Sequence, residues 1–162
     1  MSGAEESDRF LLCRIGSRIG ALALKDVRET MRPLPIEPLP GMPPFVLGVA
    51  IVRGFPAPIV DAARLLKPLE SPAPPRISPP TARFVSLKLA GRTAALAVDA
   101  VLDIRGLGTG ILADIPPLLR ETGAEQMAAI GALDAQLLFV LEAARLVPEP
   151  VWSAIKASEA PA

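Results

Sequence analysis

Few residues of this 162-residue chain have the chemistry that catalysis or metal binding requires. The sequence contains no histidine and no tyrosine, which removes the most common general base and a common general acid. The one cysteine, Cys13, lies in the apolar stretch RFLLCRI, so we expect a buried, unreactive thiol rather than a nucleophile. Only carboxylates remain as metal ligands. We therefore expect no catalytic residue, no metal site and no cofactor, and we expect that the protein is not an enzyme.

A glycine-rich segment, GLGTG at 106–110, suggests a phosphate-binding loop. It lacks the lysine of a P-loop, and it lacks the GxGxxG spacing that follows a strand in dinucleotide-binding folds. We interpret it as an ordinary glycine-rich loop.

The charged residue with the most unusual position is Arg53. It ends the apolar stretch GVAIV and is followed at once by Gly54 and two prolines. One explanation is a strand-end arginine that is solvated or paired with a neighbouring carboxylate. The other is a contact to a partner, because the planar guanidinium suits carboxylates and carbonyls on another chain.

Composition limits the partners and the location. The 17 Lys+Arg balance the 17 Asp+Glu, which gives no basic surface for nucleic acid or anionic lipid. Mean hydropathy is +0.42, yet the longest apolar run, 45–52, is far shorter than the ~20 residues of a membrane span. The N-terminus MSGAEESDRF is acidic where a signal peptide is basic, and one cysteine suits a reducing compartment. We expect a cytoplasmic protein that neither binds nucleic acid nor inserts into a membrane.

The chain contains an internal repeat. RFLLCRIGSRIGALALKDV (9–27) matches RFVSLKLAGRTAALAVDAV (83–101) at an offset of 74, and IVDAARLL (59–66) matches VLEAARLV (140–147) at an offset of 81. Identical pairs include Phe10 and Phe84, Leu22 and Leu96, and Arg64 and Arg145. The same alignment places Asp134 opposite Arg53, so the repeat does not require a cation there.

Each unit is typical of short strands joined by tight turns. We expect two-residue turns at 16–17 and 90–91, and a further strand pair broken at Gly54. The prolines at 56 and 58 place their missing donors on one side, which must be a free edge or a bend. Asp61 should cap the helix AARLL, and Arg64 and Arg145 should each pair with the acid three residues earlier.

We predict an all-β fold with short helices, built as two small β-barrels. The expected divisions are an N-terminal tail (1–8), a first half (9–67), a proline-rich linker (68–82), a second half (83–148) and a C-terminal helix or tail (149–162). Residues 9–66 and 83–147 should each form one barrel, with Phe10 and Phe84 in equivalent core positions.

The stretch FVLGVAIVRGFPAPIVDAARLL (45–66) resembles the signature of the CheW family of chemotaxis coupling proteins, a Phe-x-x-Gly-Val-x-Asn-Leu-Arg-Gly-x-x-x-Pro-x-x-Asp run. Segments 9–31, 83–104 and 123–147 resemble the opening strands, the start of the second half and the closing strands of that family. The resemblance covers roughly 9–148. The chain departs from the pattern at Ile51, where the family usually has asparagine, and at Ala135, where a turn glycine is common.

The resemblance implies two SH3-like five-stranded barrels around a shared apolar core. It also implies a non-enzymatic adaptor that couples the cytoplasmic tips of methyl-accepting chemoreceptors to the regulatory domain of a CheA-type histidine kinase, in a two-component pathway. The alternative is a CheW-like or SH3-like scaffold whose partner lies outside any chemoreceptor array.

The same resemblance gives three receptor-contact candidates: Val27, Glu29 and Arg53. Arg53 matches a conserved arginine of the family, and the other two match positions in its receptor groove. Val27 recurs in the second half as Val101, and Glu29 faces Asp103. Residues that recur are needed by the fold itself, so recurrence favours a structural role for these two.

Overall fold

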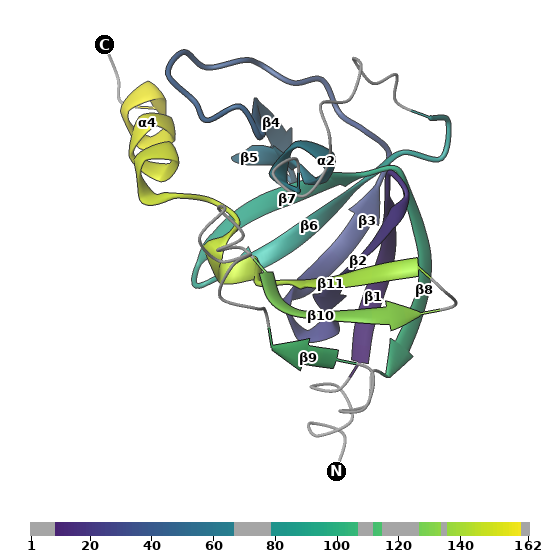
Figure 1. The fold of residues 1–162 in the computed structure, drawn as a ribbon. Helices are drawn as coiled ribbons and strands as arrows, with labels where there is room; N and C mark the ends of the chain where they lie inside the picture. Colours follow the sequence, from purple (N-terminus) through teal and green to yellow (C-terminus); the bar gives the residue numbers. More distant parts are fainter. Residues whose placement is uncertain (1–8, 67–78, 107–111, 115–126, 134–135, 160–162) are drawn as a thin grey trace.

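The computed structural model describes residues 9–66, 79–106, 112–114, 127–133 and 136–159. Most of them lie in two β-sheets, which we call sheet A and sheet B (Figure 1). Short helical segments connect the strands, and one longer helix ends the described chain. The expected all-β class with short helices is therefore confirmed.

The strands of sheet A lie in the order β8 (Ala100–Gly106), β1 (Arg9–Ile15), β2 (Arg18–Ala23), β11 (Gln136–Leu141), β10 (Met127–Leu133) and β9 (Leu112–Asp114). Those of sheet B lie in the order β3 (Val27–Met31), β6 (Arg83–Leu89), β7 (Arg92–Val98), β5 (Phe55–Asp61) and β4 (Val46–Val52). The helical segments are η1 (Leu24–Asp26), α2 (Ala62–Leu65), η3 (Ala143–Arg145) and α4 (Glu149–Glu159). In neither sheet do the described strands join edge to edge through a backbone ladder.

The internal repeat is confirmed by the register of the strands. Phe10 lies opposite Ala23 in the β1–β2 pair, and Phe84 lies opposite Ala97 in the β6–β7 pair, which is the same pairing displaced by 74 residues. The parallel β11–β2 and β5–β7 pairs also correspond residue for residue under the two offsets. Even the irregularities recur, since β4 and β10 shift register at matching positions.

The prediction that each half forms its own barrel is wrong. Sheet A joins β1 and β2 of the first half to four strands of the second, and sheet B joins β6 and β7 to three strands of the first (Figure 1). The halves have therefore exchanged strands. The repeat could not reveal this, because β2 and β7 are equivalent and offer the same edge to an incoming parallel strand.

A shared apolar core lies between the sheets, as the resemblance implied. It takes buried side chains from both, among them Leu11, Cys13 and Leu22 of sheet A and Leu87 and Leu96 of sheet B. Each sheet also has a smaller cluster of its own. Phe10 packs against the cluster of sheet A and Phe84 belongs to that of sheet B, so the prediction of equivalent positions for the two phenylalanines is confirmed.

The Asp61 cap is confirmed, because its carboxylate accepts a hydrogen bond from the Ala63 N–H at 3.1 Å and lies 3.5 Å from Arg64. The expected pairing of Arg145 with Glu142 is wrong, because no ion pair joins these two described residues. The Glu142 side chain also makes no cap hydrogen bond. Glutamate is a poor N-cap because its longer side chain does not return to the backbone as aspartate does. The segment there is only a single 3-10 turn.

The prolines of β5 lie where a backbone donor is dispensable. β7 pairs with β5 only from Ile59 onward, so Pro56 and Pro58 have a free edge on that side. Upstream, the proline-rich segment 33–44 crosses β4, where Glu37 and Val49 exchange two backbone hydrogen bonds of 2.8 and 2.9 Å. Gly48 permits this crossing, since a Cβ on it would collide with the Glu37 carbonyl.

Candidate functional site

Arg53 occupies the tip of a tight hairpin. Val52 pairs with Phe55, so Arg53 and Gly54 are the two residues of the β4–β5 turn. Both have left-handed backbones, with φ of 52° and 84°. Such turns favour asparagine or glycine at the first position, because a longer side chain there is strained by roughly 1–2 kcal/mol. Backbone strain of this kind is a feature of functional sites.

Glu29 holds the Arg53 guanidinium from one side. The Arg53 Nε lies 3.1 Å from both carboxylate oxygens, and Nη2 lies 3.0 Å from Oε2. The Arg53 side chain is 71% exposed and that of Glu29 is 29% exposed. The Glu29 backbone is fixed in turn by Ser86, whose buried hydroxyl accepts from the Glu29 N–H and donates to its carbonyl. Among the described residues, Nη1 of Arg53 makes no hydrogen bond or ion pair of its own.

This ion pair connects opposite edges of sheet B. Glu29 lies on β3, which forms one edge, and Arg53 follows β4, which forms the other. The two edges approach because a twisted five-stranded sheet curls on itself. Of the two explanations of Arg53, pairing with a neighbouring carboxylate is therefore observed, while the guanidinium is still exposed enough to reach a partner.

Val27 lies apart from this pair. β3 shifts register between Val27 and Glu29, so Val27 is opposite Leu87 while Glu29 is opposite Ser86. Directly paired residues share a face of a sheet, and Leu87 and Ser86 point to opposite faces. Val27 therefore packs partly buried against the shared core. Of the three candidates, the structure brings together Glu29 and Arg53 and directs Val27 elsewhere.

Two apolar side chains at the same hairpin were not among the sequence candidates. Ile51 is 63% exposed and Phe55 is 67% exposed, on either side of the Arg53–Gly54 turn. The signal that could have identified Ile51 was its departure from the family's asparagine. For Phe55, the order of apolar and polar residues along FPAPIVD gave no indication that the side chain is exposed.

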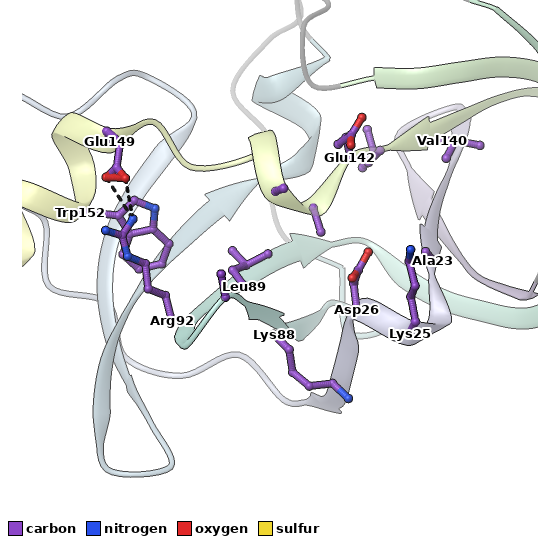
Figure 2. Close-up of a pocket in the computed structure, with 14 residues that line it drawn as sticks. Ala23, Lys25, Asp26, Lys88, Leu89, Arg92, Val140, Glu142, Glu149 and Trp152 are labelled. Carbon is purple, nitrogen blue, oxygen red and sulfur yellow. Dashed lines mark hydrogen bonds and ion pairs between the residues drawn. The ribbon is translucent and has the colours of Figure 1, made fainter. Parts of the chain in front are cut away.

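A second surface lies where the C-terminal segment crosses the molecule (Figure 2). A shallow groove of about 710 Å³ is lined by β2, η1, the β6–β7 turn, η3 and the start of α4. Arg92 lies between two residues of α4: its Nη1 is 2.9 Å from Glu149, and its Cζ is 5.0 Å from the centroid of the Trp152 ring (Figure 2). Three acids balance three cations along the groove, so it has no strong preference for a charged ligand.

The described residues contain no arrangement suited to catalysis at Cys13. Cys13 is fully buried, and burial raises the pKa of its thiol to about 12. No group of three or more acidic, cysteine or histidine side chains able to hold a metal occurs within the described part of the chain. Residues 107–110 of the GLGTG segment lie outside the described residues, as does Asp134, the counterpart of Arg53. None of the helices described is long and apolar enough to cross a membrane.

Comparison of the sequence with known proteins finds one matching family and several relatives. The model of the CheW-like domain family matches residues 9–151. The "Probable chemotaxis protein CheW" of Rhizobium etli is 31% identical over 149 residues, which cover 89% of this chain and 90% of the relative. "Protein FrzA" of Myxococcus xanthus is 31% identical over 129 residues, covering 78% and 76%.

A solved structure gives the same fold. The scaffolding protein TtCheW from Thermoanaerobacter tengcongensis superimposes with a TM-score of 0.69 at 18% identity, covering 87% of this chain and 97% of the other.

Proposed function

Because the chain belongs to the CheW-like domain family, we propose that it couples the cytoplasmic tip of a chemoreceptor to the regulatory domain of a CheA-type histidine kinase. At the coarser level it is an adaptor of chemosensory signal transduction, as its relatives named for chemotaxis indicate. The observation that carries the proposal is the family match over 9–151, which spans both sheets.

The chemistry of the surface supports an adaptor rather than an enzyme. An adaptor needs exposed apolar and charged side chains on rigid elements, and it needs no nucleophile. The Glu29–Arg53 pair and the flanking Ile51 and Phe55 provide such a surface. The buried thiol of Cys13, with its raised pKa, is not available for covalent chemistry. We propose that the protein acts without turnover, in the cytoplasm where receptor tips and kinase meet.

We propose that Glu29 and Arg53 form the receptor contact, with Arg53 as the direct donor. Two of its nitrogens are held by Glu29, which fixes the plane of the guanidinium and leaves Nη1 for an acceptor on the receptor. Val27 contributes to this contact indirectly. It is the first residue of β3, and its side chain packs against the shared core, which holds the strand that carries Glu29 in place.

The decisive experiment is a binding titration of the full chain with two purified probes: the regulatory domain of the CheA-type kinase encoded in the same genome, and a cytoplasmic receptor fragment. Binding of both probes, separately and together in one ternary complex, is expected. Failure to bind either probe under conditions where the folded chain is monodisperse refutes the coupling function. Binding of neither, with capture of an unrelated partner, supports the alternative of a scaffold outside chemoreceptor arrays.

A further inference from the structure

A buried hydroxyl lies behind the proposed contact. Of the residues that the structure describes, Ser86 is the only polar one that is buried, and it has no exposed area. It lies on β6, opposite Glu29 of β3 on one side and Ala95 of β7 on the other. Burial of a hydroxyl is unfavourable unless it forms hydrogen bonds. The Ser86 hydroxyl forms them with the Glu29 backbone alone: it accepts from the N–H at 3.2 Å and donates to the carbonyl at 3.3 Å.

Glu29 lies where β3 shifts register. Val27 is opposite Leu87 and Glu29 is opposite Ser86, so β3 has one extra residue at this point. A shift of this kind disrupts the ladder locally, and the backbone groups there need other partners. The Ser86 hydroxyl serves both the N–H and the carbonyl of Glu29. It therefore fixes the backbone from which the Glu29 side chain projects.

The second half of the chain contains the same irregularity without a hydroxyl. Cys13 is opposite Val101 and Leu12 is opposite Asp103, which is the β3–β6 pattern under the 74-residue offset. Leu12 is the counterpart of Ser86, and it is buried in the apolar cluster of sheet A. The register shift and the packing around it therefore form without a serine.

The acids at the two equivalent positions make different contacts. Asp103 is bonded within its own strand, to the Ile104 N–H at 2.8 Å and to Arg105 at 3.4 Å. Glu29 reaches across sheet B, and both of its carboxylate oxygens lie 3.1 Å from Nε of Arg53. A contact within one strand moves with that strand, whereas a contact between opposite edges depends on where each backbone lies. The serine is thus found at the register shift whose acid must be held in position.

We propose that Ser86 is a positioning residue for the receptor contact. Its hydroxyl fixes the Glu29 backbone, and the Glu29 carboxylate fixes the plane of the Arg53 guanidinium. Arg53 then meets its acceptor with less side-chain freedom left to lose, which favours binding. Ser86 is buried and touches no partner itself, so it acts only through the other two. This inference rests on the proposed receptor contact at Arg53.

The first test needs no receptor. In the nuclear magnetic resonance spectrum of the full chain, the Nε–H signal of Arg53 is assigned by its loss in Arg53→Lys. We expect this proton to exchange with water about 10-fold faster or more in Ser86→Ala than in wild type. Thr81→Val is the matched control, because the Thr81 hydroxyl also donates to a backbone carbonyl, that of Asp99, at 2.7 Å and outside the contact. The control should exchange as wild type does, and unchanged exchange in folded Ser86→Ala overturns the inference.

The second test separates positioning from a general loss of stability. Ser86→Ala should lower the affinity for the receptor fragment by about 3-fold or more in the wild-type background. In the Arg53→Ala background the same substitution should change affinity by less than about 2-fold, because no guanidinium remains to be positioned. Equal losses in the two backgrounds overturn the inference, and so does an equal loss in Thr81→Val. Wild-type protein that binds no receptor fragment is a failure of the proposed function instead, and proton exchange then still decides whether Ser86 holds Arg53.

Discussion

Arg53 Nη2 lies 3.0 Å from Glu29 Oε2, across the opening between the two edge strands of sheet B. The two residues are 24 positions apart and come from β3 and the β4–β5 turn. No backbone ladder joins the two edge strands among the described residues, so this ion pair is a side-chain connection between the edges of the sheet. Because the Arg53 side chain is 71% exposed and solvent screens the pair, we expect its contribution to folding to be small and its orientation of Arg53 to matter for binding.

Replacing Arg53 by alanine separates these two roles. The exposed pair should contribute no more than about 0.5–1 kcal/mol to the free energy of unfolding. Binding of the receptor fragment should weaken by about 1–3 kcal/mol, the usual cost of losing a charge-assisted interface contact. Arg53→Lys should recover only part of it. Thermal unfolding and titration of the same samples measure both, and a variant that melts far below wild type yet binds normally makes Arg53 a purely architectural residue.

Arg53→Asn should stabilise the fold while it weakens binding. Asparagine tolerates the left-handed backbone of this turn, so unfolding should cost about 0.5–1 kcal/mol more, measured by urea denaturation. Ala90→Asn is the control, because Ala90 has a φ of 47° in the β6–β7 turn and lies outside the proposed contact. Because Ala90 has no ion pair to lose, this variant should stabilise the fold by at least as much as Arg53→Asn and leave receptor binding unchanged. Loss of stability in both variants would refute the strain at these turns.

Cys13 should resist thiol reagents in the native protein. With its pKa raised to about 12 by burial, the thiol carries almost no thiolate at pH 8, and the reagent has no access to it. Labelling with a chromogenic disulfide should be slow in buffer and complete within minutes in guanidinium chloride. Rapid labelling without denaturant contradicts the buried position between the sheets.

Gly48→Ala should destabilise the protein by at least about 2 kcal/mol. The new Cβ collides with the Glu37 carbonyl and with Ile36, and the backbone φ of 144° is one that side chains rarely adopt. Gly54→Ala provides the comparison, because its Cβ meets open space and only the φ of 84° is unfavourable. It should cost about 1 kcal/mol. Equal effects of the two substitutions in urea denaturation would mean that the 33–44 segment yields to the added methyl.

Arg92→Ala should loosen the start of α4 without unfolding the chain. It removes the bond to Glu149 and the stacking on Trp152, which together are worth about 0.5–1 kcal/mol at an exposed site. Because Trp152 is the only tryptophan, its fluorescence reports the change directly. We expect emission shifted to longer wavelength, while Arg64→Ala, whose observed partners are Asp61 and the Pro44 carbonyl rather than residues of α4, leaves the spectrum as in wild type.

The sequence predicted the local structure well and the long-range structure less well. The 74-residue offset identified β1, β2, β6 and β7 with their turns, and the Asp61 cap followed from residue type alone. These features depend on neighbours in the chain. The long-range features depend on which of two equivalent strands, β2 or β7, an incoming strand pairs with. They include the exchange of strands between the halves and the meeting of Glu29 with Arg53. A repeat makes those two strands alike, so pattern alone could not distinguish them.

The candidate site shows the same division. Arg53 was identified by its position at the end of an apolar run, but its partner Glu29 was known only as a family position. The register shift after Val27 turned that residue to the other face, and no residue type in RETM announces such a shift. Phe55 was missed because a phenylalanine within a strand is ordinarily a core residue.

The exchange of strands has a consequence for the symmetry of the chain. In each half, the second strand (β2 or β7) pairs with a parallel strand from the other half. One half alone therefore lacks a partner for that strand, whereas two identical copies related by a twofold axis supply it to each other. The single chain therefore has the layout of a homodimer whose two subunits are joined end to end. Within one chain the two copies are released from the identity that symmetry imposes, so one carries Ile51, Arg53 and Phe55 where the other carries Ala132, Asp134 and Gln136. A symmetric dimer has two equal faces, whereas this chain has two different ones, which the proposed coupling of two unlike partners requires.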